Sequence, residues 1–93
     1  MRLKKHGAFL VNYVISFANG EIDRQAFDMD YSGYIIEHFP AFQAEHPRLS
    51  AKFAYTIDEA YENFSRMEDE VFRDAISDAV DDFLDARPVA DID

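Results

Sequence analysis

The sequence has no cysteine and no tryptophan, and it has only three glycines and three prolines among its 93 residues. Without cysteine the chain has no disulfide and no thiolate metal ligand, which fits a reducing compartment, and we expect the protein to be cytoplasmic. No stretch alternates polar and apolar residues with the period of two that indicates a strand. The apolar run near the N-terminus is too short to span a membrane.

Positive charge is also scarce, because nine Lys and Arg face nineteen Asp and Glu, and the net charge is −10. The imbalance is uneven along the chain. Residues 1–67 hold seven basic and nine acidic residues, whereas residues 68–93 hold two basic and ten acidic ones. A surface of this charge repels nucleic acid and anionic membranes, and it attracts a basic protein partner.

Apolar residues recur with helical spacing in several stretches, and Gly20, Pro40 and Pro47 stand at the expected helix ends. The pattern predicts longer helices over 7–19, 31–39, 47–64 and 66–87, and short helical turns over 23–27 and 40–46. We therefore predict an all-α fold, a compact bundle of four to five helices whose last two form an antiparallel hairpin. Residues 1–87 are expected to make one domain, and residues 88–93 a flexible acidic tail.

The last predicted helix separates its apolar and acidic residues most clearly. Its apolar side carries Phe72, Ile76, Ala79, Val80 and Phe83 at steps of three and four. Five aspartates follow the other side and are the predicted partner-binding residues, namely Asp74, Asp78, Asp81, Asp82 and Asp85. We therefore expect a regulatory interaction module that presents carboxylates to a basic protein, and one form of it is a nucleic-acid mimic that occupies a basic cleft.

The stretch 28–39 is similar to the calcium-binding loop of an EF-hand. Asp28, Asp30 and Ser32 stand at loop positions 1, 3 and 5, and Gly33 stands at position 6. Position 12, where the EF-hand has a glutamate that grips calcium with both oxygens, is Phe39. This pattern leaves a weak calcium site open as an alternative, with Asp28, Asp30, Ser32 and Glu37 as its candidate ligands. In the other interpretation, the two aspartates cap a helix.

The three histidines lack the spacings that place two metal ligands on one helical face. No catalytic triad order, phosphate-binding glycine loop or metal-hydrolase signature is present, so we expect neither an enzyme nor a cofactor. A further alternative is a structural protein without a ligand, in which an aromatic face forms a homodimer.

Overall fold

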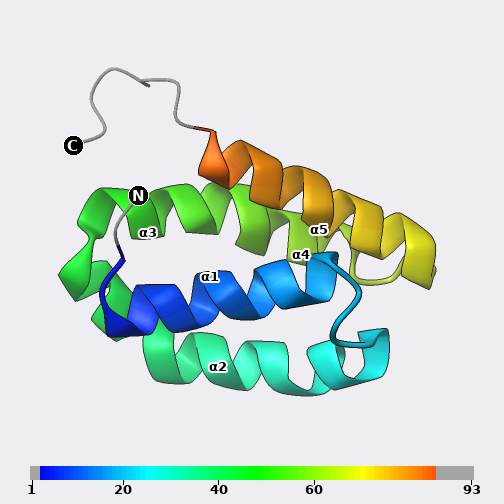
Figure 1. Cartoon of the computed structure of the whole chain (residues 1–93), viewed down its shortest axis with the longest axis horizontal. Coiled ribbons are helices and arrows are strands. Elements are labelled where there is room, and N and C mark those ends of the chain that lie inside the picture. The colour runs from blue at the N-terminus through cyan, green and yellow to red at the C-terminus, as the bar shows by residue number, and fades with distance from the viewer. Residues whose placement is uncertain (1–2, 86–93) are drawn as a thin grey trace.

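The computed structural model describes residues 3–85, and within them the chain forms helices and no strand (Figure 1). The three longer helices are α1 (Lys5–Ala18), α2 (Arg24–Glu45) and α5 (Asp69–Leu84). Between α2 and α5 run α3 (Pro47–Phe53), the π-helical segment η1 (Ala54–Asp58) and α4 (Glu59–Phe64), without a break between them. The predicted all-α compact bundle is confirmed. The predicted tail, residues 88–93, lies outside the described residues.

The helices pack around α1, which lies between α2 and α5 in Figure 1. The rod made by α3, η1 and α4 runs alongside α5, and its first part also contacts α2. The bundle measures 36 × 27 × 21 Å along its principal axes. In this arrangement one side of α5 faces the solvent. α4 faces α5 on one side and α2 on the other.

Two glycines have conformational roles at the ends of α1. Gly20 follows its C-terminus with a φ of +84°, the left-handed conformation that the Asn19-Gly20 pair predicts. Gly7 lies where α1 crosses α2, and a Cβ atom there would stand 2.7 Å from the ring of Phe42. A side chain at this position would push α1 and α2 apart.

The prediction that Pro40 ends a helix is wrong, because α2 continues from Arg24 through Pro40 to Glu45. Pro40 has no N–H, so the carbonyl of Ile36 loses its usual partner. Pro40 lies on the exposed side of α2, and the Ile36 side chain is 78% exposed, so water can replace the missing donor. Asp23 caps the start of α2, since its carboxylate accepts from the Ala26 N–H at 2.8 Å.

The helix predicted over 47–64 is present, and Pro47 opens it as expected. It widens into a π-helical turn around Thr56, whose hydroxyl donates to the Lys52 carbonyl at 2.6 Å. Ser65 and Glu68 have the spacing of a capping box but do not form one. Glu68 is itself the N-cap residue of α5, and the Ser65 carbonyl instead accepts from Arg24 at 2.6 Å.

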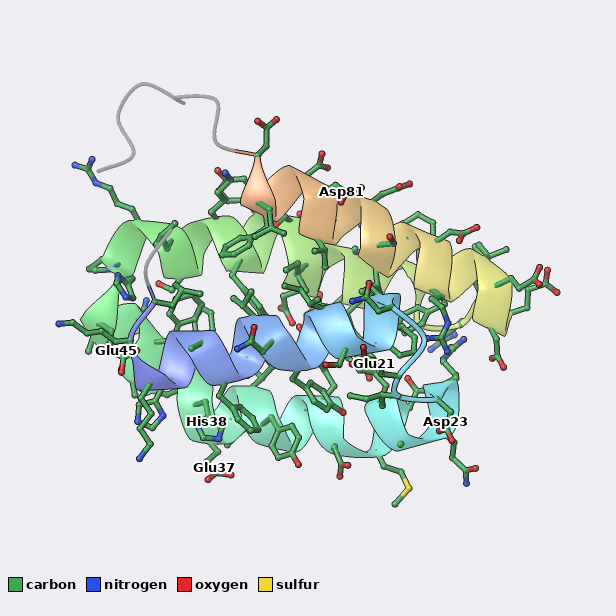
Figure 2. All side chains as sticks on the ribbon, viewed as in Figure 1. Glu21, Asp23, Glu37, His38, Glu45 and Asp81 are labelled. Carbon is green, nitrogen blue, oxygen red and sulfur yellow. The ribbon has the colours of Figure 1, made fainter. Side chains whose placement is uncertain are left out.

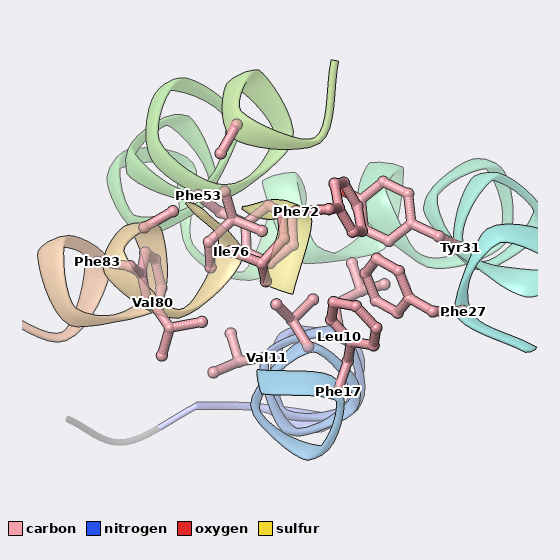
Figure 3. Packing of buried hydrophobic residues seen from close by; sticks show 14 of the residues in the cluster. Leu10, Val11, Phe17, Phe27, Tyr31, Phe53, Phe72, Ile76, Val80 and Phe83 are labelled. Carbon is pink, nitrogen blue, oxygen red and sulfur yellow. The ribbon is translucent and has the colours of Figure 1, made fainter. Parts of the chain in front are cut away.

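The core is largely aromatic (Figure 3). Six phenylalanines from α1, α2, α3 and α5 have no exposed surface, namely Phe17, Phe27, Phe42, Phe53, Phe72 and Phe83. The apolar face predicted for α5 is buried as a whole, and so is the Leu10, Val14 and Phe17 face of α1. Burial of such large side chains dominates the stability of a domain this small.

No helix within residues 3–85 is both long enough and apolar enough to cross a membrane.

Candidate protein-interaction surface

The outer side of α5 carries four aspartates that are exposed to solvent, namely Asp74, Asp78, Asp81 and Asp82. We call these four residues the acidic surface. They are exposed because Phe72, Ile76, Ala79, Val80 and Phe83 turn the opposite side of the helix into the core. Figure 2 shows Asp81 pointing away from the bundle. Along the helix, Asp74, Asp78 and Asp82 follow one another at intervals of about 6 Å, given the rise of an α-helix.

Asp85, the fifth predicted partner-binding residue, has a different environment. It is the C-cap residue of α5 and is only partly exposed. Its backbone carbonyl accepts a hydrogen bond from the ammonium group of Lys52 at 2.9 Å, and Lys52 is itself buried. A cation at a helix C-terminus is favourable for the helix dipole. Asp85 therefore contributes to the end of the helix as well as to its acidic side.

Within residues 3–85, no ion pair or side-chain hydrogen bond is made by the carboxylates of the acidic surface. The arginine on the same helix turns inward instead. The guanidinium carbon of Arg73 lies 4.2 Å from the centre of the Phe17 ring, and its Nη1 donates to the carbonyls of Phe17 and Ile22. Arg73 thus joins α5 to the end of α1 and leaves the acidic surface without a cation beside it on the helix.

A groove of about 340 Å³ runs between the acidic surface and the neighbouring helix. Tyr55, Glu59 and Asn63 line one wall, and Asp78 and Asp82 line the other. Small side chains separate the two walls, contributed by Ala60, Ala75 and Ala79. Carboxylates therefore face the same groove from two helices, an arrangement that suits a cationic ligand with several hydrogen-bond donors. We call it the α4–α5 groove.

Sequence reasoning did not place Glu59 and Tyr55 beside the aspartates of α5. Glu59 belongs to a different helix and is separated from Asp78 by many residues, so no local pattern connects them. The available signal was the repetition of alanine at positions 75 and 79 beside the aspartates of α5. Small side chains at helical spacing leave a shallow strip along the surface of a helix, but their pattern does not identify the helix that lies opposite.

The calcium-loop interpretation is wrong in its geometry, because residues 28–39 form the middle of α2. Asp28 and Asp30 are therefore fixed on different sides of a helix, where their carboxylates cannot converge as they do in an EF-hand loop. Asp28 pairs with Arg24 at 2.9 Å, and Glu37 lies 3.7 Å from the His38 ring. Ser32 is exposed on the same helix. In the described part of the chain, no group of three or more metal-ligating side chains comes together.

The histidines tie the start of α1 to α2. Nδ1 of His6 lies 2.8 Å from Nδ1 of His38, a hydrogen bond in which one ring donates and the other accepts. The Lys4 N–H donates to the His46 ring at 3.1 Å, and the Glu45 carboxylate accepts from the N–H of Gly7 at 3.2 Å. The expectation that His38 is partly buried is confirmed. Sequence spacing predicted none of these contacts, because they join residues more than thirty positions apart.

Tyr31 and Asp58 form the polar contact between α2 and η1. The Tyr31 hydroxyl donates to the Asp58 carboxylate at 2.8 Å. Burial, together with the negative charge of Asp58, raises the pKa of Tyr31 well above its ordinary value. The hydroxyl therefore stays protonated and keeps one Asp58 oxygen oriented.

The chain matches no protein-family model, no curated protein and no solved structure in the comparisons made. The case for a function consequently rests on the residues and their geometry alone.

Proposed function

We propose that this protein is an interaction module that binds a basic surface of another protein through the acidic surface and the α4–α5 groove. The observation that carries the proposal is that carboxylates line both walls of that groove, while the nearby arginine of α5 is bonded to the core side. Unpaired carboxylates side by side repel one another, and a cationic partner removes that repulsion. We expect the protein to act in the cytoplasm, and we propose no catalytic role for it.

One form of this function is mimicry of nucleic acid. A basic cleft that binds DNA or RNA contacts rows of phosphates, and here Asp74, Asp78 and Asp82 form one row while Glu59 faces them from α4. For any basic partner of this kind, duplex DNA should compete with the protein for the same site. A partner that binds DNA and this protein simultaneously would restrict the function to an ordinary adaptor.

The test compares two variants of equal net charge. The first is D74N/D78N/D82N, which neutralises one row of the acidic surface. The matched control is E21Q/D30N/E37Q, which removes three exposed carboxylates outside α5. Each variant carries a net charge of −7, so any effect of total charge is the same for both.

The measurement is the Kd of an arginine-rich peptide, by calorimetry at low and at physiological salt. We expect the α5 variant to bind at least tenfold more weakly than the native protein, and the control to bind within about twofold of it. Equal weakening of the two variants would show that only net charge matters, and it would overturn the proposal. Binding that is insensitive to salt would also contradict it, since exposed ion pairs are screened.

The homodimer is the alternative that sedimentation equilibrium tests. The predicted dimer face is aromatic, and the exposed aromatic side chains within residues 3–85 are Phe9 and Tyr55, at 38% and 54%. Met29 and Ile36 of α2, 74% and 78% exposed, offer an alternative apolar surface for a second copy. A monomer at micromolar concentration contradicts the dimer. A tight dimer would give the exposed side of α2 a structural role.

A further inference from the structure

A second groove lies on the other side of the rod, where η1 and α4 face α2. Its volume is about 290 Å³. Tyr31, Ile35 and Ile36 line it from α2, and Asp58, Tyr61 and Glu62 line it from η1 and α4. We call it the α2–α4 groove. None of its residues belongs to the acidic surface or to the α4–α5 groove.

The walls of this groove combine apolar and acidic side chains. The rings of Tyr31 and Tyr61 stack with their centroids 4.3 Å apart, and the Ile36 side chain beside them is largely exposed. Asp58 and Glu62 are four residues apart and therefore lie one helical turn from each other. A ligand that suits this groove needs an apolar stem and a cationic end.

The Asp58 carboxylate is held in place before any ligand arrives. One of its oxygens accepts the hydroxyl hydrogen of Tyr31 at 2.8 Å, and the Tyr31 side chain is 1% exposed and so cannot easily rotate away. The remaining acceptor capacity of Asp58 can serve a donor from outside. A carboxylate that is already oriented loses less entropy on binding than a free one.

The molecule itself shows which cation suits such a surface. Arg24 places its guanidinium carbon 4.1 Å from the centre of the Phe72 ring, and its nitrogens donate to Asp28 and to the Ser65 carbonyl. Arg73 repeats the arrangement over Phe17. In both cases a planar guanidinium stacks on an aromatic ring while its edge donates to oxygens. The α2–α4 groove offers the partly exposed ring of Tyr61 and carboxylate oxygens, and the structure places no arginine among its lining residues.

We propose that the α2–α4 groove binds an arginine side chain of a protein partner, with the guanidinium over the Tyr61 ring and its edge at Asp58 and Glu62, and with the stem along Ile36. Charge complementarity and the two internal arginine sites select this occupant. The proposal goes beyond the function of the acidic surface, because it concerns a different face of the rod. Each of the two proposals stands if the other fails.

The test is a titration followed by amide chemical shifts in nuclear magnetic resonance spectra. The probe is a capped Gly-Arg-Gly peptide, and the comparison peptide is capped Gly-Lys-Gly. We expect saturable shifts confined to residues 31–36 and to Asp58, Tyr61 and Glu62, and an affinity for the lysine peptide at least threefold lower. The lysine ammonium is a compact point charge and lacks the planar fork that stacks on rings and pairs with carboxylates.

Two single substitutions supply the matched control. Glu62→Gln removes a carboxylate from the α2–α4 groove, and we expect it to raise the Kd of the arginine peptide at least fivefold. Glu21→Gln removes an exposed carboxylate that lines neither groove, and we expect a change below twofold. The α5 variant D74N/D78N/D82N should also keep its affinity for this peptide, which separates this test from that of the acidic surface.

Several results would overturn the proposal. These are shifts that grow linearly without saturation, equal effects of the Glu62 and Glu21 substitutions, and equal affinity for the two peptides. Tighter binding of agmatine than of the capped peptide would mark a small-molecule site and would reject a protein partner. Protection of the same amides in a homodimer without peptide would show that a second copy occupies the groove.

Discussion

α2 and α5 are both rich in carboxylates but use them differently. On α2, Asp28 pairs with Arg24, and the Glu45 carboxylate accepts hydrogen bonds from N–H groups at the start of α1. On α5, the aspartates of the acidic surface contact no cation within the described residues. The comparison shows that acidic composition alone does not identify a binding surface. Carboxylates with both oxygens engaged inside the protein, as in Glu45, have less acceptor capacity left for a partner.

The substitution with the largest expected effect on this contrast between α2 and α5 is Arg24→Ala. It removes the cation that forms an ion pair with Asp28. Arg24 is only 14% exposed at its side chain, and it also holds the turn before α5 through the carbonyls of Ser65 and Met67. We expect the free energy of unfolding to fall by about 2–4 kcal/mol, since a charged donor with several partners is lost. Arg66→Ala at an exposed position is the control and should change it by less than about 0.5 kcal/mol. Chemical denaturation measures both, and equal effects would contradict the structural role of Arg24.

A smaller effect is expected where a carboxylate of α2 supports another helix. Glu45→Ala leaves the N–H groups of His6 and Gly7 without their acceptor, and it removes a negative charge beside the N-terminus of α1. The expected loss is about 1–2 kcal/mol of unfolding free energy. Asp81→Ala on the acidic surface should cost less than about 0.5 kcal/mol. A larger loss of unfolding free energy in Asp81→Ala than in Glu45→Ala would contradict the contrast between α2 and α5.

Alkaline pH tests the contact between α2 and Asp58. Because the pKa of Tyr31 is raised in the folded state, the unfolded chain releases this proton first, near its ordinary value of 10.0. The folded state then binds more protons than the unfolded one, so stability is complete below pH 10 and falls as the pH rises further. The slope is up to about 1.4 kcal/mol per pH unit for one such group. Burial likewise raises the pKa of Tyr13, to about 12, and adds to the fall.

Thermal melts between pH 9 and pH 11 measure this dependence. Tyr31→Phe should lower stability at neutral pH, because it removes the hydrogen bond to Asp58, and should make the alkaline fall shallower. Tyr55→Phe, at an exposed side chain, is the control and should leave the slope unchanged. An unchanged slope in Tyr31→Phe would mean that Tyr31 ionises normally in the folded protein.

The smallest expected effect has the opposite sign. D74N/D78N/D82N removes like charges one helical turn apart, and each such pair costs about 0.2–0.5 kcal/mol. We therefore expect this variant to be more stable than the native protein by about 0.5–1 kcal/mol at low salt. The gain should disappear in molar salt, which screens exposed charges. Loss of stability at low salt would mean that the acidic surface has structural partners.

The helix whose buried residues were predicted best is the one with a single buried side. α5 turns one row of apolar residues inward, so the period of 3.6 is visible in the sequence and its buried residues could be listed in advance. α2 packs against both α1 and α3 and exposes Met29 and Ile36, so its apolar residues do not form one row. This lack of a pattern, together with Pro40, divided one helix into three predicted pieces and made its middle resemble a loop.

The candidate site was predicted only in its local part. Four of the five selected aspartates lie together on the exposed side of α5, and the fifth, Asp85, lies at its C-terminal cap. The sequence did not place Glu59 and Tyr55 opposite these aspartates in the α4–α5 groove, nor Tyr61 and Glu62 opposite α2 in the α2–α4 groove. These groups come from different helices, and the sequence contains no signal for the direction in which one helix faces another.

The sequence by itself determined that the chain is helical, that its core is aromatic and that negative charge collects near its C-terminus. Those properties depend on composition and on spacings within a few helical turns. The tertiary structure alone decided that α2 passes through Pro40, that Arg24 and Arg73 bond inward, and that two grooves flank α4. The physical reason is that hydrogen bonds and charge pairs act over a few ångströms in space. Only packing brings residues forty positions apart within that range.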